Sequence, residues 1–189
     1  MIYVTDQQAN VMVEIEKAQP DSAWRTLSPP FPAGHFLQPA GMVVEADGSL
    51  IVADSGHNRL VLLSADRQTA SVFAPDGDAI GSLWHPVGIT HGDGESLLIA
   101  DTGNHRIVRC DSVAAPQWSA FGSGGSGVGK FIAPTSLAMN AVGQIVIADP
   151  GAGRLVRINA MDARVGRKFL CPHATASHDR TALLEPVMN

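Results

Sequence analysis

The stretch that decides the fold of this 189-residue chain reads Leu98-Ile99-Ala100-Asp101-Thr102-Gly103-Asn104-His105-Arg106-Ile107-Val108. Its first three residues form an unbroken apolar run, which is typical of a strand covered on both faces. The polar segment from Asp101 to His105 has the composition of a tight turn, and a second apolar run begins after Arg106. The stretch therefore predicts two strands joined by a short polar turn.

The same pattern occurs four times along the chain. An aspartate follows an apolar run at each of Asp6, Asp54, Asp101 and Asp149, and these aspartates are 48, 47 and 48 residues apart. Self-similarity at a fixed spacing of this length is the signature of a repeat architecture. The chain is therefore expected to consist of repeated structural units.

Each full unit reads as four short strands. In the second unit the strands are expected at Ala40–Glu45, Leu50–Ala53, Arg59–Leu63 and Thr69–Phe73, with a hairpin signal at Ala46-Asp47-Gly48. Four strands in 40 to 50 residues is the pattern of a propeller blade. A single blade cannot bury both of its faces, so we expect the core to lie between stacked blades.

The sequence thus predicts an all-β protein, a β-propeller of about four four-stranded blades in a single domain spanning residues 1–189. The expected parts are a portion of blade 1 at 1–30, blade 2 at 36–75, blade 3 at 83–122, blade 4 at 131–170 and a tail at 171–189 that begins a further strand. Either the tail strand completes blade 1 and closes a four-bladed ring, or the propeller is partial. We favour a partial or incompletely closed propeller, whose open blade edges would permit self-association.

Several segments match one known repeat family. Pro39 to Val44 and Pro86 to Ile89 match its opening Pro-x-Gly segment, and Asp101 to Ile107 matches its Asn-His-Arg motif in full. Asp54 to Leu60 matches with Asn and His exchanged. These segments resemble the NHL repeats, which implies a β-propeller. The departures are Val11 in place of arginine, Pro134-Thr135-Ser136 in place of Pro-x-Gly, and Ala152-Gly153 in place of Asn-His.

The repeated turn residues are expected to have structural roles. An aspartate at a strand end can accept hydrogen bonds from the amides of the following turn. Glycines in these turns suit a positive φ. The arginines can pair with an aspartate of their own or of a neighbouring blade. These residues are Asp54, Gly56, Arg59, Asp101, Gly103, Arg106, Asp149, Gly151 and Arg154.

The candidate binding residues precede the blade-opening prolines. Trp84 and His85 stand directly before Pro86, and Phe36 and Phe131 occupy the corresponding region of the neighbouring repeats, where they are also expected to fill a gap. Aromatic residues concentrate at the centres of interfaces. Trp24 and Trp118 are expected to pack between blades. We expect these entrance loops on one rim and the aspartate turns on the opposite rim, and therefore a non-enzymatic module that binds a protein or peptide.

A metal-dependent lyase or hydrolase is the alternative. An amidating lyase of the propeller superfamily is similar to this architecture and holds metal near the axis, which His85 and His91 would approach. The positions equivalent to His85 and His91 in the neighbouring blades carry no metal-ligating residues, so no cofactor is expected. Binding of zinc or calcium remains the alternative hypothesis. Cys171, His173 and His178 crowd together only in the tail. No Ser-His-Asp spacing or paired carboxylates indicate catalytic residues.

Charge and hydropathy limit the remaining partners. The formal net charge of −5 disfavours nucleic acid, although some NHL proteins bind RNA. No run of 18 apolar residues predicts a membrane span, and the segment after Met1 does not resemble a signal peptide, so a cytoplasmic location is the default expectation.

Gly124 to Lys130 fits part of a phosphate-binding loop, but Phe131 stands where serine or threonine is needed.

Overall fold

The computed structural model describes residues 1–16, 24–27, 35–74, 80, 82–159 and 168–170. Within them the chain is built from strands, and the only helical elements are three single 3₁₀ turns: η1 (Ser55–His57), η2 (Thr102–Asn104) and η3 (Pro150–Ala152). In this described part, no helix is long and apolar enough to cross a membrane. The all-β prediction is therefore confirmed.

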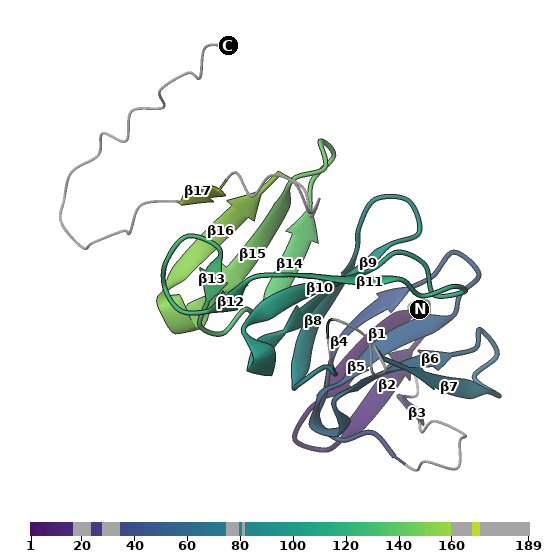
Figure 1. The fold of residues 1–189 in the computed structure, drawn as a ribbon. Coiled ribbons are helices and arrows are strands. Elements are labelled where there is room, and N and C mark those ends of the chain that lie inside the picture. The colour runs from purple at the N-terminus through teal and green to yellow at the C-terminus, as the bar shows by residue number, and fades with distance from the viewer. Residues whose placement is uncertain (17–23, 28–34, 75–79, 81, 160–167, 171–189) are drawn as a thin grey trace.

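The strands form four antiparallel sheets that follow one another in chain order (Figure 1). We call these sheets blades 1 to 4. Blade 1 consists of β1 (Ile2–Asp6), β2 (Val11–Ile15) and β3 (Arg25–Leu27), and blade 2 of β4 (Pro39–Val44), β5 (Leu50–Asp54), β6 (Arg59–Leu63) and β7 (Ala70–Phe73). Blade 3 consists of β8 (Pro86–His91), β9 (Leu97–Asp101), β10 (Arg106–Cys110) and β11 (Trp118–Phe121), and blade 4 of β14 (Ser136–Met139), β15 (Ile145–Asp149), β16 (Arg154–Ile158) and β17 (Lys168–Leu170). The strands of blade 2 begin and end within one residue of the predicted positions.

A short parallel pair, β12 (Ser123–Gly124) and β13 (Lys130–Phe131), lies in the connection between blades 3 and 4. This connection contains the glycine-rich segment that resembles a phosphate-binding loop. Among the described residues no helix directly follows Lys130, and the next element is the strand β14. The segment therefore lacks the helix N-terminus that would face a phosphate.

The first strands of blades 2 to 4 lie side by side at the inner edge of the arc, with β8 between β4 and β14 (Figure 1). The glycine of the Pro-x-Gly segment makes this approach possible. A Cβ on Gly41 would lie 2.6 Å from the carbonyl oxygen of Val87, and a Cβ on Gly88 would lie 2.5 Å from that of Thr135. Ser136 takes this position in blade 4 and is exposed, with no further blade beside it in the described chain.

The core lies between the blades, and this explains the unbroken apolar runs. In β5, Leu50 and Val52 pack toward blade 1, whereas Ile51 and Ala53 pack toward blade 3. All four are fully buried. Alternate residues of β9 divide in the same way between blades 2 and 4. A strand covered on both faces needs apolar residues at every position, as the sequence predicted.

The two end blades each leave an apolar face exposed in the described structure. Ile2 and Val4 of β1 are 44% and 40% exposed. Leu155 of β16 is 55% exposed, whereas its equivalents Leu60 and Ile107 are fully buried against the next blade. The fold is thus a partial β-propeller of four stacked sheets. The predicted tail strand at 171–189 lies outside the described residues.

Candidate functional site

The entrance loops and the aspartate turns lie on the same rim of the propeller. In blades 2 to 4 the first strand leaves this rim and the second strand returns to it, so Pro39 pairs with Asp54 and Pro86 pairs with Asp101. The expectation that the two sets of loops occupy opposite rims is therefore wrong. We call this side the turn rim. The opposite side, formed by the hairpins at 45–49, 92–96 and 140–144, is the hairpin rim.

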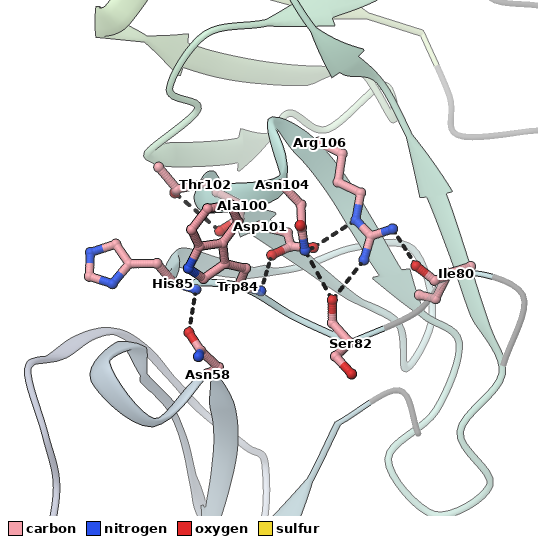
Figure 2. Close-up of polar contacts among 10 residues, drawn as sticks. All are labelled: Asn58, Ile80, Ser82, Trp84, His85, Ala100, Asp101, Thr102, Asn104 and Arg106. Atoms are coloured by element: carbon pink, nitrogen blue, oxygen red, sulfur yellow. Dashed lines mark hydrogen bonds and ion pairs between the residues drawn. The ribbon is translucent and has the colours of Figure 1, made fainter. Parts of the chain in front are cut away.

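Asp101 is the centre of the polar cluster in blade 3 (Figure 2). Its carboxylate is fully buried and accepts hydrogen bonds on both oxygens. Oδ1 accepts from the backbone amide of Trp84 at 2.7 Å, while Oδ2 accepts from Arg106 Nε at 2.7 Å and from Asn104 Nδ2 at 2.9 Å. A buried carboxylate is stable when its oxygens are satisfied in this way.

Arg106 extends the cluster to the connection that leads into blade 3. Its guanidinium donates to the carbonyl oxygen of Ile80 and, at 3.1 Å, to that of Ser82. Asn104 donates to the same Ser82 oxygen at 3.0 Å (Figure 2). The sequence left open whether the arginine pairs within its own blade or with a neighbour. It pairs with the aspartate of its own blade and fixes the incoming chain.

Blades 2 and 4 repeat this arrangement. Asp54 accepts from the amide of Leu37 and from Arg59 Nε, both at 2.7 Å. Asp149 accepts from the amide of Ala133 at 2.8 Å and from Arg154 Nε at 3.3 Å. The backbone amides that these aspartates bond belong to the entrance loop of their blade, and not to the following turn as the sequence predicted. From the following turn only side chains reach them, namely Asn104 at Asp101 and His57 at Asp54.

Blade 1 is the exception. Asp6 is exposed and accepts at 2.9 Å from the amides of Gln8 and Ala9, which belong to the following turn. Val11 stands where the other blades have arginine. The predicted turn geometry thus occurs only here among the described blades, where no entrance loop lies beside the carboxylate.

The turn glycines are required for space and not for a positive φ. A Cβ on Gly56 would lie 2.4 Å from Leu37 Cγ, one on Gly103 would lie 2.7 Å from the carbonyl oxygen of Trp84, and one on Gly151 would lie 2.7 Å from Ile132 Cγ2. The left-handed residue comes two positions later, at Asn58 (φ 57°), His105 (φ 57°) and Gly153 (φ 61°). The expectation of positive φ at the three glycines is wrong.

Side chains at two of these left-handed positions, and at the equivalent Asn10 of blade 1 (φ 58°), join one blade to the next. Asn10 Oδ1 accepts from the amide of Gln38 at 2.7 Å, and Asn58 Oδ1 accepts from the amide of His85 at 2.7 Å. His105 Nδ1 donates to the carbonyl oxygen of Ile132 at 2.7 Å.

Hydroxyl groups form a second set of junction bonds. Ser55 Oγ donates to the carbonyl oxygen of Pro86, and Thr102 Oγ1 donates to that of Pro134 at 2.5 Å. Blade 4 has Pro150 and Gly153 at the two corresponding positions. Sequence reasoning missed these junction bonds, although the recurrence of a hydroxyl after the aspartate was the signal.

Trp84 is the most exposed aromatic side chain of the described turn rim. It is 59% exposed although its backbone is held at both polar atoms: its amide donates to Asp101, and its carbonyl oxygen accepts from the amide of Gly103 at 2.9 Å. The indole lies over Gly103 and the ring of His85 extends beside it (Figure 2). His85 is exposed, with its amide fixed by Asn58.

Phe36 and Phe131 are buried, at 1% and 0% exposure. They occupy the same place as Leu83, which is 2% exposed, and fill the space between blades. Their burial takes two of the four predicted binding residues out of reach of a partner. The residues that reach the surface come one position later, at Leu37, Trp84 and Ile132.

The other two tryptophans differ from each other. Trp118 in β11 is half-buried, and its ring centroid lies 6.1 Å from that of Phe73 in blade 2. This contact between blades agrees with the predicted packing role. Trp24 is 70% exposed, so the packing predicted for it is not present in the described structure.

The candidate metal ligands are not brought together. His85 precedes β8 on the turn rim and His91 ends β8 on the hairpin rim, so the six-residue strand separates them. Among the described residues no group of three histidine, cysteine, aspartate or glutamate side chains is arranged to hold a metal. Cys171, His173 and His178 lie outside the described residues.

Comparison with known proteins supports the repeat and the fold. The model of the NHL repeat matches residues 36–61, which include the Pro-x-Gly segment and the aspartate turn of blade 2. The resemblance to NHL repeats is therefore confirmed for that segment. No curated protein matches the sequence significantly.

Solved structures with the same fold are propeller proteins. A streptogramin B lyase aligns with a TM-score of 0.62 at 15% identity, over 82% of this chain and 47% of the lyase. Virginiamycin B lyase from Staphylococcus aureus aligns at 0.61 and 18%, over 82% and 47%. A gluconolactonase from Xanthomonas campestris aligns at 0.60 and 15%, over 84% and 58%. The chain thus spans about half the length of these structures, and identities this low establish the fold alone.

Proposed function

We propose that this protein is a non-enzymatic interaction module whose turn rim binds a peptide or a loop of a partner protein, with Trp84 at the centre of the contact. The observation that carries the proposal is that a large aromatic side chain is exposed on a rigid backbone. Tryptophan is enriched among the residues that dominate binding energy at interfaces. A side chain whose backbone is already fixed loses little conformational entropy when a partner binds.

The surroundings of Trp84 suit a peptide. The blades on either side present Leu37, half-buried, and Ile132, 40% exposed, at the equivalent positions of their entrance loops. His85 and Gln38 are exposed between these apolar side chains. Apolar anchors with polar groups between them are what a specific peptide-binding surface needs.

The test is a selection of binding peptides from a random display library on the purified chain, followed by calorimetry with Trp84→Ala. We expect this substitution to weaken the selected peptides by about thirtyfold or more, the effect of losing an interface residue worth ~2 kcal/mol. Val142→Ala is the matched control, because Val142 is 77% exposed on the hairpin rim. Peptides that bind Trp84→Ala as tightly as the unsubstituted chain would refute the proposal.

The same preparation tests the alternatives. Metal analysis is expected to find zinc and calcium below one equivalent, and a full equivalent of either would support a metal-dependent lyase or hydrolase instead. RNA binding is disfavoured by the net charge of −5. A measurable RNA affinity that falls steeply with added salt would support that alternative.

A further inference from the structure

A cleft lies between blades 2 and 3 on the hairpin rim, on the side opposite Trp84. Its volume is about 870 Å³. Pockets that bind small molecules in proteins are typically roughly 300–1,000 Å³. Its walls are the hairpin after β4, the hairpin after β8, and the loop at 111–117 between β10 and β11. The cleft is thus large enough for a ligand and is formed by two blades rather than by one loop.

The inner wall of the cleft is apolar. Ile51 is fully buried, and Leu62 and Val113 are partly buried against the core between the two blades. Val44, at the end of β4, is 46% exposed in the cleft wall. An apolar surface of this kind favours the hydrocarbon part of a ligand, since its burial removes both surfaces from water.

The mouth of the cleft is acidic. Glu45, Asp47 and Glu95 line it, and the described lining residues include no lysine or arginine. The one basic side chain among them is His91, whose Nε2 lies 3.3 Å from Glu45 Oε1. Hydrogen bonds from Ser49 hold the pKa of Asp47 below its ordinary value, so this carboxylate stays ionised at neutral pH.

Two arginines contact the loops that form the cleft, and both have other partners. Arg67 donates to the carbonyl oxygen of Gly48 at 3.0 Å and to the hydroxyl of Tyr3 in blade 1 at 2.7 Å. Arg109 already forms ion pairs with two other carboxylates, Asp93 and, at 2.6 Å, Asp111. Carboxylates at the mouth of a cleft with low-dielectric walls focus a negative potential on the space inside. The electrostatics of the cleft therefore select for a positively charged group.

We propose that this cleft is a second binding site, independent of the turn rim, and that its ligand is a small organic cation with an apolar body. The ammonium or amidinium group lies among Glu45, Asp47 and Glu95 at the mouth. The apolar body packs on Val44, Leu62 and Val113. Glu45 comes from blade 2 and Glu95 from blade 3, so the bound cation would bridge the two blades.

The test uses three probes of one size and shape: 4-phenylbutylamine, the corresponding alcohol and the corresponding carboxylic acid. Binding is followed by chemical-shift changes in the NMR spectrum of the 15N-labelled full chain. The amine is expected to shift the amides of the cleft residues and to bind about tenfold more tightly than the alcohol, with the acid weaker still. Equal binding of amine and alcohol would overturn the proposal, and so would shifts confined to the turn rim.

Substitutions locate the charge effect. Glu45→Gln and Glu95→Gln are each expected to weaken the amine about threefold, the usual worth of an exposed ion pair, and to leave the alcohol unchanged. Asp6→Asn removes the same charge on the turn rim of blade 1 and is the matched control. An equal loss in Asp6→Asn would show a non-specific effect of net charge and would refute the assignment.

A substitution that adds charge gives an independent check. Ser112 donates to Glu95 at 3.3 Å from the loop of blade 3. Ser112→Lys puts an ammonium group beside Glu95, where it would compete with the ligand, and is expected to weaken the amine at least tenfold. Undiminished binding would contradict the proposed position of the cation. None of these results depends on whether the turn rim binds a peptide.

Discussion

Replacing Asp101 with alanine should destabilise the protein far more than the same change at Asp6. Asp101 is fully buried and accepts from the amide of Trp84, from Arg106 and from Asn104. Its removal leaves the Arg106 guanidinium, whose side chain is only 15% exposed, without its carboxylate. Breaking a buried ion pair from one side typically costs ~3–5 kcal/mol. Arg106 keeps its bonds to the connection before blade 3, so we expect about 3 kcal/mol.

For a chain of this size a loss of 1 kcal/mol lowers Tm by roughly 2–4 °C, so Asp101→Ala should melt ~6–12 °C below the unsubstituted protein. The measurements are thermal and urea unfolding followed by far-UV circular dichroism. Asp6 is exposed and bonds only two amides of its own turn, so Asp6→Ala should cost less than about 1 kcal/mol. Similar losses in both variants would show that the buried network around Asp101 does not stabilise the blade.

Two further predictions concern the packing around the turn and the core. Gly103→Ala should lower Tm more than Gly127→Ala and should also change the Trp84 fluorescence. A Cβ at 103 would meet the Trp84 carbonyl oxygen at 2.7 Å, whereas at Gly127, whose φ is not positive, the nearest atom is Lys130 Cδ at 3.8 Å. Equal melting of the two variants would contradict the steric reason. Burial raises the pKa of Cys110 from 9.0 to about 11, so in a Cys171→Ser background alkylation at pH 8 should be about a hundredfold slower in the folded than in the unfolded chain. Because the folded thiol keeps its proton at higher pH than the unfolded one, the stability it contributes should be lost as the pH rises from 9 to 11.

The fold was largely predictable because each local signal in the sequence agreed with the others. The unbroken apolar runs before Asp54 and Asp101 have one structural solution, a strand covered by a neighbour on each face, and β5 and β9 are such strands. The spacing of the aspartates then fixed the length of each repeat. Pairing between arginine and aspartate was also foreseen, though not its place within a single blade.

The candidate site was harder to predict because it depends on contacts between distant segments. A pattern shows that Gly103 recurs, but not that Trp84 fills the space beside it. Phe36 and Phe131 stand next to the surface positions in the sequence, and a shift of one residue separates a buried side chain from an exposed one. The placement of the two sets of loops on one rim was derivable, since the second strand of an antiparallel hairpin returns to where the first began.

The bonds at the blade junctions differ in polarity. Asn58 accepts from a backbone amide of blade 3, whereas His105 donates to a backbone carbonyl of the loop entering blade 4. A repeat that is duplicated or moved by recombination would carry only its own side of each junction. Its accepting or donating side chain would then meet a new entrance loop that does not offer the complementary backbone group. Rearranged chains should therefore assemble well only when the residue after each aspartate turn is changed together with the repeat. The junction at His105 therefore favours the placement of blade 4 after blade 3.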